Sequence, residues 1–201
     1  MKLQRIAEFR QYRLHPGARE TLVALFEREF VETQEACGIH VAGIFRDLDD
    51  PDRFTWLRGF DTMEARATAL GAFYDGPVWA RHRNAANATM IDSDDVHLLE
   101  TCDGEAVTAA DGGAVLAIIV RQRGGVFRDI RPAGRNLGSF RTLAKPNNWP
   151  RLPVNEGDPV RLWLAGFGSV SEMDAARAGI AGKADDVEYR RLTPTARSRL
   201  R

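Results

Sequence analysis

The chain has 201 residues, of which 44% are hydrophobic and 28% charged, a composition typical of a globular protein that buries a core. Lysine plus arginine equals aspartate plus glutamate at 28 each, so no overall positive field would draw the protein to nucleic acid or to an anionic membrane. The two cysteines, Cys37 and Cys102, lie far apart and outside any CxxC spacing, which argues against a disulfide framework and a structural zinc site.

No stretch of the sequence has the apolar character of a targeting or membrane segment. The first residues, MKLQRIAEFRQYR, carry charges throughout, and no later run reaches the roughly 18 apolar residues of a membrane span. We therefore expect a cytoplasmic protein with no membrane or nucleic-acid partner and no metal site.

The first hundred residues predict the element order βαββαβ. An alternating strand ends in the turn sequence His15-Pro16-Gly17, and apolar residues at three- and four-residue steps follow as an amphipathic helix. Asp61 and Glu64 have the spacing of a capping box, and Pro77 suits the first turn of a further helix. Strands are predicted at 6–14, 39–48, 53–60 and 96–101, and helices at 18–37, at 61–74 and from Pro77 onward.

The second half repeats this order in degenerate form. WLRGF at 56–60 returns as WLAGF at 163–167, and GIFRDLDDP at 43–51 returns as GSFRTLAKP at 138–146, in the same order along the chain. These echoes favour an internal duplication. Strands are predicted at 114–123 and 187–192, and a helix from Ser171 to Ile180.

Two segments depart from the repeat. Residues 124–137 are too few and too rich in glycine for a long helix, so a single turn or short helix is the most they predict. Residues 146–159 hold four of the nine prolines and predict an inserted loop that cannot be a central strand.

These patterns divide the chain into three parts. We predict a first half at 1–101, a linker at 102–113 and a second half at 114–201. The terminal run TPTARSRLR, at 193–201, is expected to be solvated.

A βαββαβ unit places both helices on one face of its sheet and leaves the other face to be covered. Strand alternation puts Glu8, Arg10 and Tyr12 on one face of the first strand, and Trp56 and Arg58 on one face of the third. We predict that these faces look inward across a barrel-like interior toward their counterparts near Trp163. The barrel could close within one chain or between two chains.

Several segments in the same order resemble the NIPSNAP family of the dimeric α/β-barrel superfamily. They are EFRQYRLHPG at 8–17, WLRGFD at 56–61, FYDGPVW at 73–79, and ANATMIDSD at 86–94 followed by LLE. The resemblance covers roughly residues 5–100. It implies a ferredoxin-like fold, a barrel formed by paired sheets and a cavity for a small molecule. Together with the internal repeat, it predicts an α+β protein of two tandem ferredoxin-like halves, the second degenerate, whose antiparallel sheets pair into a barrel, and a homodimer. The superfamily includes cofactor-free monooxygenases, isomerases, decarboxylases and dehydratases, while NIPSNAP members have no agreed chemistry.

Residues with suitable chemistry are candidates for a site. The imidazole of His82 is of the kind that proton transfer uses, Arg58 could hold a carboxylate or an enolate oxygen, and Tyr12 could donate a proton. An ordinary hydrogen-bonded histidine and an internal arginine–glutamate pair are the alternatives. The candidate ligand-binding residues are Glu8, Arg10, Phe45, Trp56, Phe73, Trp79, Phe140 and Trp163.

Three functions follow as hypotheses. The first is a cofactor-independent enzyme, of the oxygenase, isomerase, lyase or decarboxylase type, that acts on a small, partly apolar or aromatic metabolite. The second is a binding or interaction protein without turnover. The third is haem binding by a histidine beside an apolar pocket. Trp149, in the proline-rich insertion, could close over a pocket or dock on a neighbouring chain, or lie in an ordinary surface loop.

Overall fold

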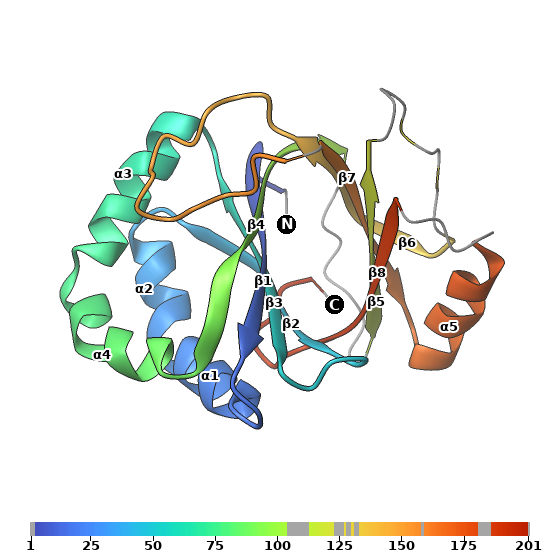
Figure 1. Ribbon diagram of the computed structural model, residues 1–201, viewed down its shortest axis with the longest axis horizontal. Coiled ribbons are helices and arrows are strands. Elements are labelled where there is room, and N and C mark those ends of the chain that lie inside the picture. The colour runs from blue at the N-terminus through green and yellow to red at the C-terminus, as the bar shows by residue number, and fades with distance from the viewer. Residues whose placement is uncertain are drawn as a thin grey trace.

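A computed structural model describes residues 3–103, 113–122, 127, 130, 133–157, 159–180 and 186–200 of the chain. Within these residues, eight strands close into one antiparallel barrel in the order β1-β3-β2-β8-β5-β7-β6-β4. Five helical segments, α1, η1, α2, α3 and α4, cover one side of the barrel, and α5 covers the opposite side (Figure 1). The barrel therefore closes within one chain.

The first half of the chain has the predicted βαββαβ order. The predicted helix at 18–37 is one helical rod with a π-helical turn in its middle, η1. Thr62, and not Asp61, caps α3, since its side chain accepts a hydrogen bond from the Ala65 amide. The fourth strand is longer than the predicted 96–101. The elements are β1 (Ile6–Leu14), α1 (Arg19–Leu25), η1 (Phe26–Phe30), α2 (Val31–Ala36), β2 (His40–Asp47), β3 (Arg53–Phe60), α3 (Met63–Tyr74), α4 (Pro77–Asn87) and β4 (Met90–Asp103).

The second half contributes the other four strands. The outer strands of the two four-stranded sheets pair with each other. Strand β8 pairs with β2 and strand β6 pairs with β4, which closes the barrel. Most of the predicted linker, 104–112, and most of 124–137 lie outside the described residues. The elements are β5 (Ala114–Arg121), β6 (Arg135–Thr142), β7 (Val160–Phe167), α5 (Val170–Gly179) and β8 (Val187–Pro194). No helix in the described part of the chain is long and apolar enough to cross a membrane.

Strands β1, β2, β3 and β5 bury both of their faces. One apolar cluster fills the barrel interior and includes Phe9, Phe45, Leu57 and Phe140. A second cluster lies between the sheet of the first half and helices α1 to α4, and a third lies under α5. A strand buried on both faces shows no alternation between apolar and polar residues, and β1 has only one exposed residue, Arg13.

The predicted inward faces are therefore wrong. Tyr12 and Trp56 belong to the cluster under the helices, and Trp163 packs against the cluster under α5. The guanidinium of Arg58 lies over the rings of Trp56 and Phe60, which belong to the same cluster, so Arg58 also lies on the helix side of the sheet. The barrel interior instead receives the opposite face of β1, which carries Phe9.

The proline-rich insertion crosses from the second half to the first. Residues 143–157, which we call the strap, contain no helix or strand and run from the end of β6 over toward α3, as the orange segment in Figure 1 shows. The ring of Trp149 lies 5.2 Å from that of Tyr74, at the end of α3. The strap thus docks on the helices of its own chain.

The C-terminal tail is packed and not simply solvated, contrary to the sequence prediction. Leu200 is fully buried and belongs to the cluster in the barrel interior. The backbone amides of Arg199 and Leu200 donate to the carbonyl of Ala42, at a bulge of β2. An irregularity in the β2 ladder therefore supplies the acceptor that holds the tail.

Glycines make room for two phenylalanines of the barrel interior. A methyl group added at Gly43 would lie 2.5 Å from the ring of Phe45, and one at Gly138 would lie 2.8 Å from the ring of Phe140. Both glycines border a bulge in their strand, in β2 and in β6. The same glycine–phenylalanine arrangement thus occurs once in each half.

We predict that Gly43→Ala and Gly138→Ala each lower the free energy of unfolding by about 1–3 kcal/mol, because the added methyl group overpacks a filled interior. Gly71→Ala, in α3, is the control: nothing lies within 4 Å of the added methyl group. Alanine there should stabilise the helix by about 0.5–1 kcal/mol. Urea denaturation measures all three, and equal stability of Gly43→Ala and wild type would contradict the packing described.

Candidate functional site

A cluster of buried charges lies between the sheet of the first half and its helices. The carboxylate of Glu8 accepts hydrogen bonds from Arg10 Nη1 at 2.6 Å, Arg58 Nε at 2.8 Å and Arg66 Nε at 2.7 Å. All four side chains are at most 1% exposed. We call these four residues the arginine cluster.

The strand register explains why these groups meet. Glu8 on β1 lies directly opposite Arg58 on β3, and Arg10 lies opposite Trp56. Because side chains two apart on a strand share a face, Glu8 and Arg10 point together toward the helices. Arg66 approaches from above, from the buried side of α3.

The arginine cluster holds more positive than negative charge. Burial alone would raise the pKa of Glu8, but the attraction of Arg58, Arg10 and Arg66 outweighs burial and holds this pKa far below its usual range. Burial lowers the pKa of Arg66, with Arg58 and Arg10 adding to the effect. One carboxylate therefore faces three guanidinium groups, an excess of two positive charges among the described side chains.

Aromatic rings and a tyrosine hydroxyl surround these cations. The guanidinium of Arg58 lies 5.1 Å from the ring centre of Trp56 and 5.9 Å from that of Tyr74. Arg10 Nε donates to the hydroxyl of Tyr12 at 2.9 Å. Burial raises the pKa of Tyr12, so its hydroxyl keeps its proton at neutral pH.

Three buried donors at the cluster lack a hydrogen-bond acceptor within the described residues. They are Arg66 Nη2, Trp56 Nε1 and Gln34 Nε2. The oxygen of the Gln34 amide lies 3.5 Å from Arg58 Nη1, so this glutamine is part of the same group. Buried donors without acceptors are costly, and their presence beside excess positive charge suits an anionic ligand.

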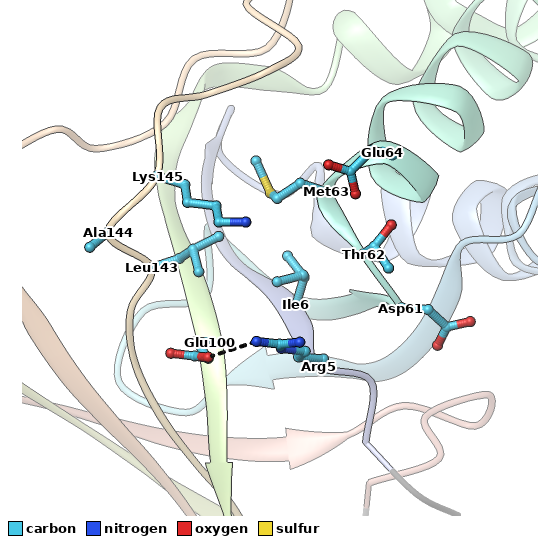
Figure 2. Close-up of a pocket in the computed structure, with 10 residues that line it drawn as sticks. All are labelled: Arg5, Ile6, Asp61, Thr62, Met63, Glu64, Glu100, Leu143, Ala144 and Lys145. Carbon is cyan, nitrogen blue, oxygen red and sulfur yellow. Dashed lines mark ion pairs between the residues drawn. The ribbon is translucent and has the colours of Figure 1, made fainter.

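A pocket of about 330 Å³ lies between β1, the start of α3 and the first residues of the strap, and none of the four cluster residues lines it (Figure 2). Its apolar lining includes Ile6, which shares a cluster with Tyr12 on the helix side of the sheet, and Met63, which lies one turn before Arg66. Figure 2 shows the amino group of Lys145 pointing into the pocket toward Ile6 and Met63, with the Arg5–Glu100 ion pair below. The pocket thus combines an apolar lining with charged groups at its edge.

The structure brings only some of the predicted site residues together. Glu8, Arg10, Tyr12, Trp56 and Arg58 meet at the cluster, and Phe73 and Trp79 lie in the same helix-side layer.

Four other predicted residues lie elsewhere. The interior of the barrel holds Phe45 and Phe140, and Trp163 packs under α5, so the predicted aromatic residues do not line one pocket. His82, on α4, lies 3.5 Å from Glu29 and packs its ring against Phe30.

Sequence reasoning missed Arg66, Gln34 and the strap asparagines Asn147 and Asn148. Arg66 could have been found, since it lies on the buried stripe of α3, three residues after Met63 and four before Leu70. An arginine inside an apolar helical stripe indicates a buried partner. The asparagines carried no such signal, because they lie in an irregular segment.

A comparison with protein families assigns the first half of the chain. Residues 7–102, just under half of the 201, match the NIPSNAP family, which confirms the resemblance seen in the sequence. A NIPSNAP family protein of unknown function from Agrobacterium tumefaciens is 19% identical, with a TM-score of 0.45 over 48% of this chain and 87% of that one. No curated protein matches the chain.

Two solved structures match nearly the whole chain. A candidate monooxygenase of Fusobacterium nucleatum is 8% identical, with a TM-score of 0.61 over 96% of this chain and 94% of that one. A candidate monooxygenase of Lactobacillus acidophilus is 10% identical, with a TM-score of 0.56 over 95% of this chain and 94% of that one. At such identities the likeness establishes a shared fold.

We predict that Glu8→Gln lowers the free energy of unfolding at pH 7 by about 3–5 kcal/mol, because it leaves buried arginines without their counter-charge. The folded-state pKa of Glu8 lies below its ordinary value of 4.5, so its stabilising effect is complete above that pH and is lost as the pH falls further. The stability difference between wild type and Glu8→Gln should therefore narrow below about pH 4.5. Urea denaturation at several pH values measures it.

Glu20→Gln is the matched control, since Glu20 pairs with Arg46 at the surface and is 60% exposed. This exposed pair should contribute less than about 1 kcal/mol. A Glu8→Gln variant as stable as Glu20→Gln, or a difference that does not change between pH 7 and pH 3, would refute the electrostatic role of Glu8.

Proposed function

Taking residues 7–102 as a NIPSNAP domain, we propose that this protein binds a small anionic, partly aromatic metabolite at the arginine cluster. One observation carries the proposal: three buried guanidinium groups share the single carboxylate of Glu8. Buried charges require compensation, and a bound anion would supply the negative charge that the protein itself does not place beside these arginines.

The surroundings define the ligand further. The unpartnered atoms Arg66 Nη2, Trp56 Nε1 and Gln34 Nε2 are all donors, which favours a ligand rich in acceptor oxygens, such as a carboxylate or an enolate. The aromatic faces of Trp56 and Tyr74 suit a planar apolar body. A carboxylic acid with an aromatic ring combines both requirements.

Turnover of this ligand without a cofactor is the second candidate function. Arginine donors stabilise the negative charge of an enolate, and a neutral Tyr12 hydroxyl can supply a proton or a hydrogen bond. Arg58 and Tyr12 are then the proposed catalytic residues, for an isomerase, lyase, decarboxylase or oxygenase reaction. The recorded contacts of His82 are to Glu29 and Phe30, so we assign the proton transfer to Tyr12.

We further infer that the second half arose as a degenerate copy of the first. The strand orders β4-β1-β3-β2 and β8-β5-β7-β6 correspond element by element, and each half has its glycine–phenylalanine pair at a bulge. The predicted boundaries, 1–101 and 114–201, follow this correspondence. Closure within one chain leaves homodimer formation as a separate proposal, which native mass spectrometry of the purified protein tests.

Ligand binding can be tested with matched probes. We predict that benzoate and phenylpyruvate raise the melting temperature of the protein, while the neutral isostere benzamide does not. Only the anions compensate the positive charge of the arginine cluster. A ligand present at 100 times its Kd stabilises the folded protein by about 2.7 kcal/mol. Arg58→Lys should weaken binding at least about tenfold, because lysine lacks the planar fork of guanidinium donors.

Arg141→Lys, at an exposed arginine paired with Glu100, is the control and should bind as wild type does. Circular dichroism establishes that each variant is folded. Equal stabilisation by benzamide and benzoate, or unchanged binding by folded Arg58→Lys, would count against the anion site. Consumption of phenylpyruvate by wild type, lost in Tyr12→Phe, would establish turnover.

A further inference from the structure

The strap covers Arg66 with two uncharged oxygen atoms. Arg66 Nη1 donates to the side-chain oxygen of Asn148 at 2.8 Å and to that of Asn147 at 3.1 Å. Two oxygen atoms on one guanidinium resemble the way a carboxylate binds, but they bring no negative charge. The positive excess of the arginine cluster is therefore left uncompensated.

Both asparagines are held with their oxygens toward Arg66. The Asn148 amide nitrogen donates to the carbonyl of Met63 at 2.6 Å, and the Asn147 amide nitrogen donates to the carbonyl of Leu152 at 2.8 Å. These bonds fix which end of each amide faces the guanidinium. Their arrangement thus presents acceptors, and only acceptors, to Arg66.

Backbone hydrogen bonds anchor both ends of the strap to β4, while side-chain contacts hold its middle. Most strap residues are exposed, and the Arg151–Asp75 ion pair lies at the surface with both partners more than half exposed. In the middle of the strap, the ring of Trp149 packs on Tyr74, whose hydroxyl lies 3.5 Å from Arg58 Nη1. Trp149 is therefore connected through one side chain to the arginine cluster.

We propose that the strap is a movable cover whose Asn147 and Asn148 hold the place of the ligand's carboxylate at Arg66. The carboxylate replaces the two amide oxygens, binds both Nη1 and the unpartnered Nη2, and brings the charge that the cluster lacks. The strap shifts as the asparagines leave. This inference rests on the proposed function, and it adds that the carboxylate of the ligand binds at Arg66.

The test compares three forms of the protein with benzoate as the probe. Because the strap competes with the carboxylate, the double variant Asn147→Ala/Asn148→Ala should bind benzoate about tenfold more tightly, which corresponds to about 1.4 kcal/mol. Asn155→Ala is the control within the strap, since Asn155 bonds to Asp95 and not to Arg66. It should bind benzoate as wild type does. Isothermal titration calorimetry measures the three affinities.

Movement of the strap has its own readout in Trp149, one of four tryptophans. Benzoate should change the tryptophan fluorescence of wild type, and Trp149→Phe should reduce that change to the part due to Trp56 at the arginine cluster, without abolishing binding. Two outcomes would refute the movable strap but not the anion site. One is that wild type binds benzoate with no change in Trp149 fluorescence, and the other is that the double variant binds benzoate no more tightly than wild type. Failure of both wild type and the double variant to bind benzoate and phenylpyruvate overturns the two proposals together.

Discussion

The carboxylate of Glu8 is the group on which the helix-side layer of the first half depends. Three arginines from β1, β3 and α3 converge on its two oxygen atoms, and each is removed from solvent. Without this carboxylate the same layer would hold three unpaired cations among aromatic rings, at a cost of several kcal/mol. The register of β1 against β3, the position of α3 and the position of the strap together place the side chains of the arginine cluster and its asparagine neighbours.

The candidate site lies outside the barrel interior, in the layer between the first sheet and its helices. Near Phe9, Phe45 and Phe140 the interior is packed with apolar side chains, and the tail residue Leu200 is buried with them. The edge strands of the two halves pair with each other, so neither sheet presents a free edge on those sides. The arginine cluster lies between the barrel and the helices, while Gln11, on the interior face of β1, bonds to Asp95 and Arg190.

The two halves share strand order but differ in what covers them. Helices α1 to α4 with η1 cover the first sheet, whereas within the described residues α5 alone covers the second. The second half adds the strap, which reaches back over α3 and contacts Arg66. The second half thus contributes contacts to the arginine cluster of the first half.

The sequence by itself determined the element order, the strand alternation and the NIPSNAP resemblance. Local signals sufficed for these: the turn at His15-Pro16-Gly17, the apolar steps of the first helix and the proline-rich insertion. Alternation also grouped Glu8 with Arg10, and Trp56 with Arg58. Which face points into the barrel was decided only by the tertiary structure. Both faces of β1 are buried, so hydrophobicity does not distinguish them, and the contacts of Arg66 with the strap join residues about 80 positions apart.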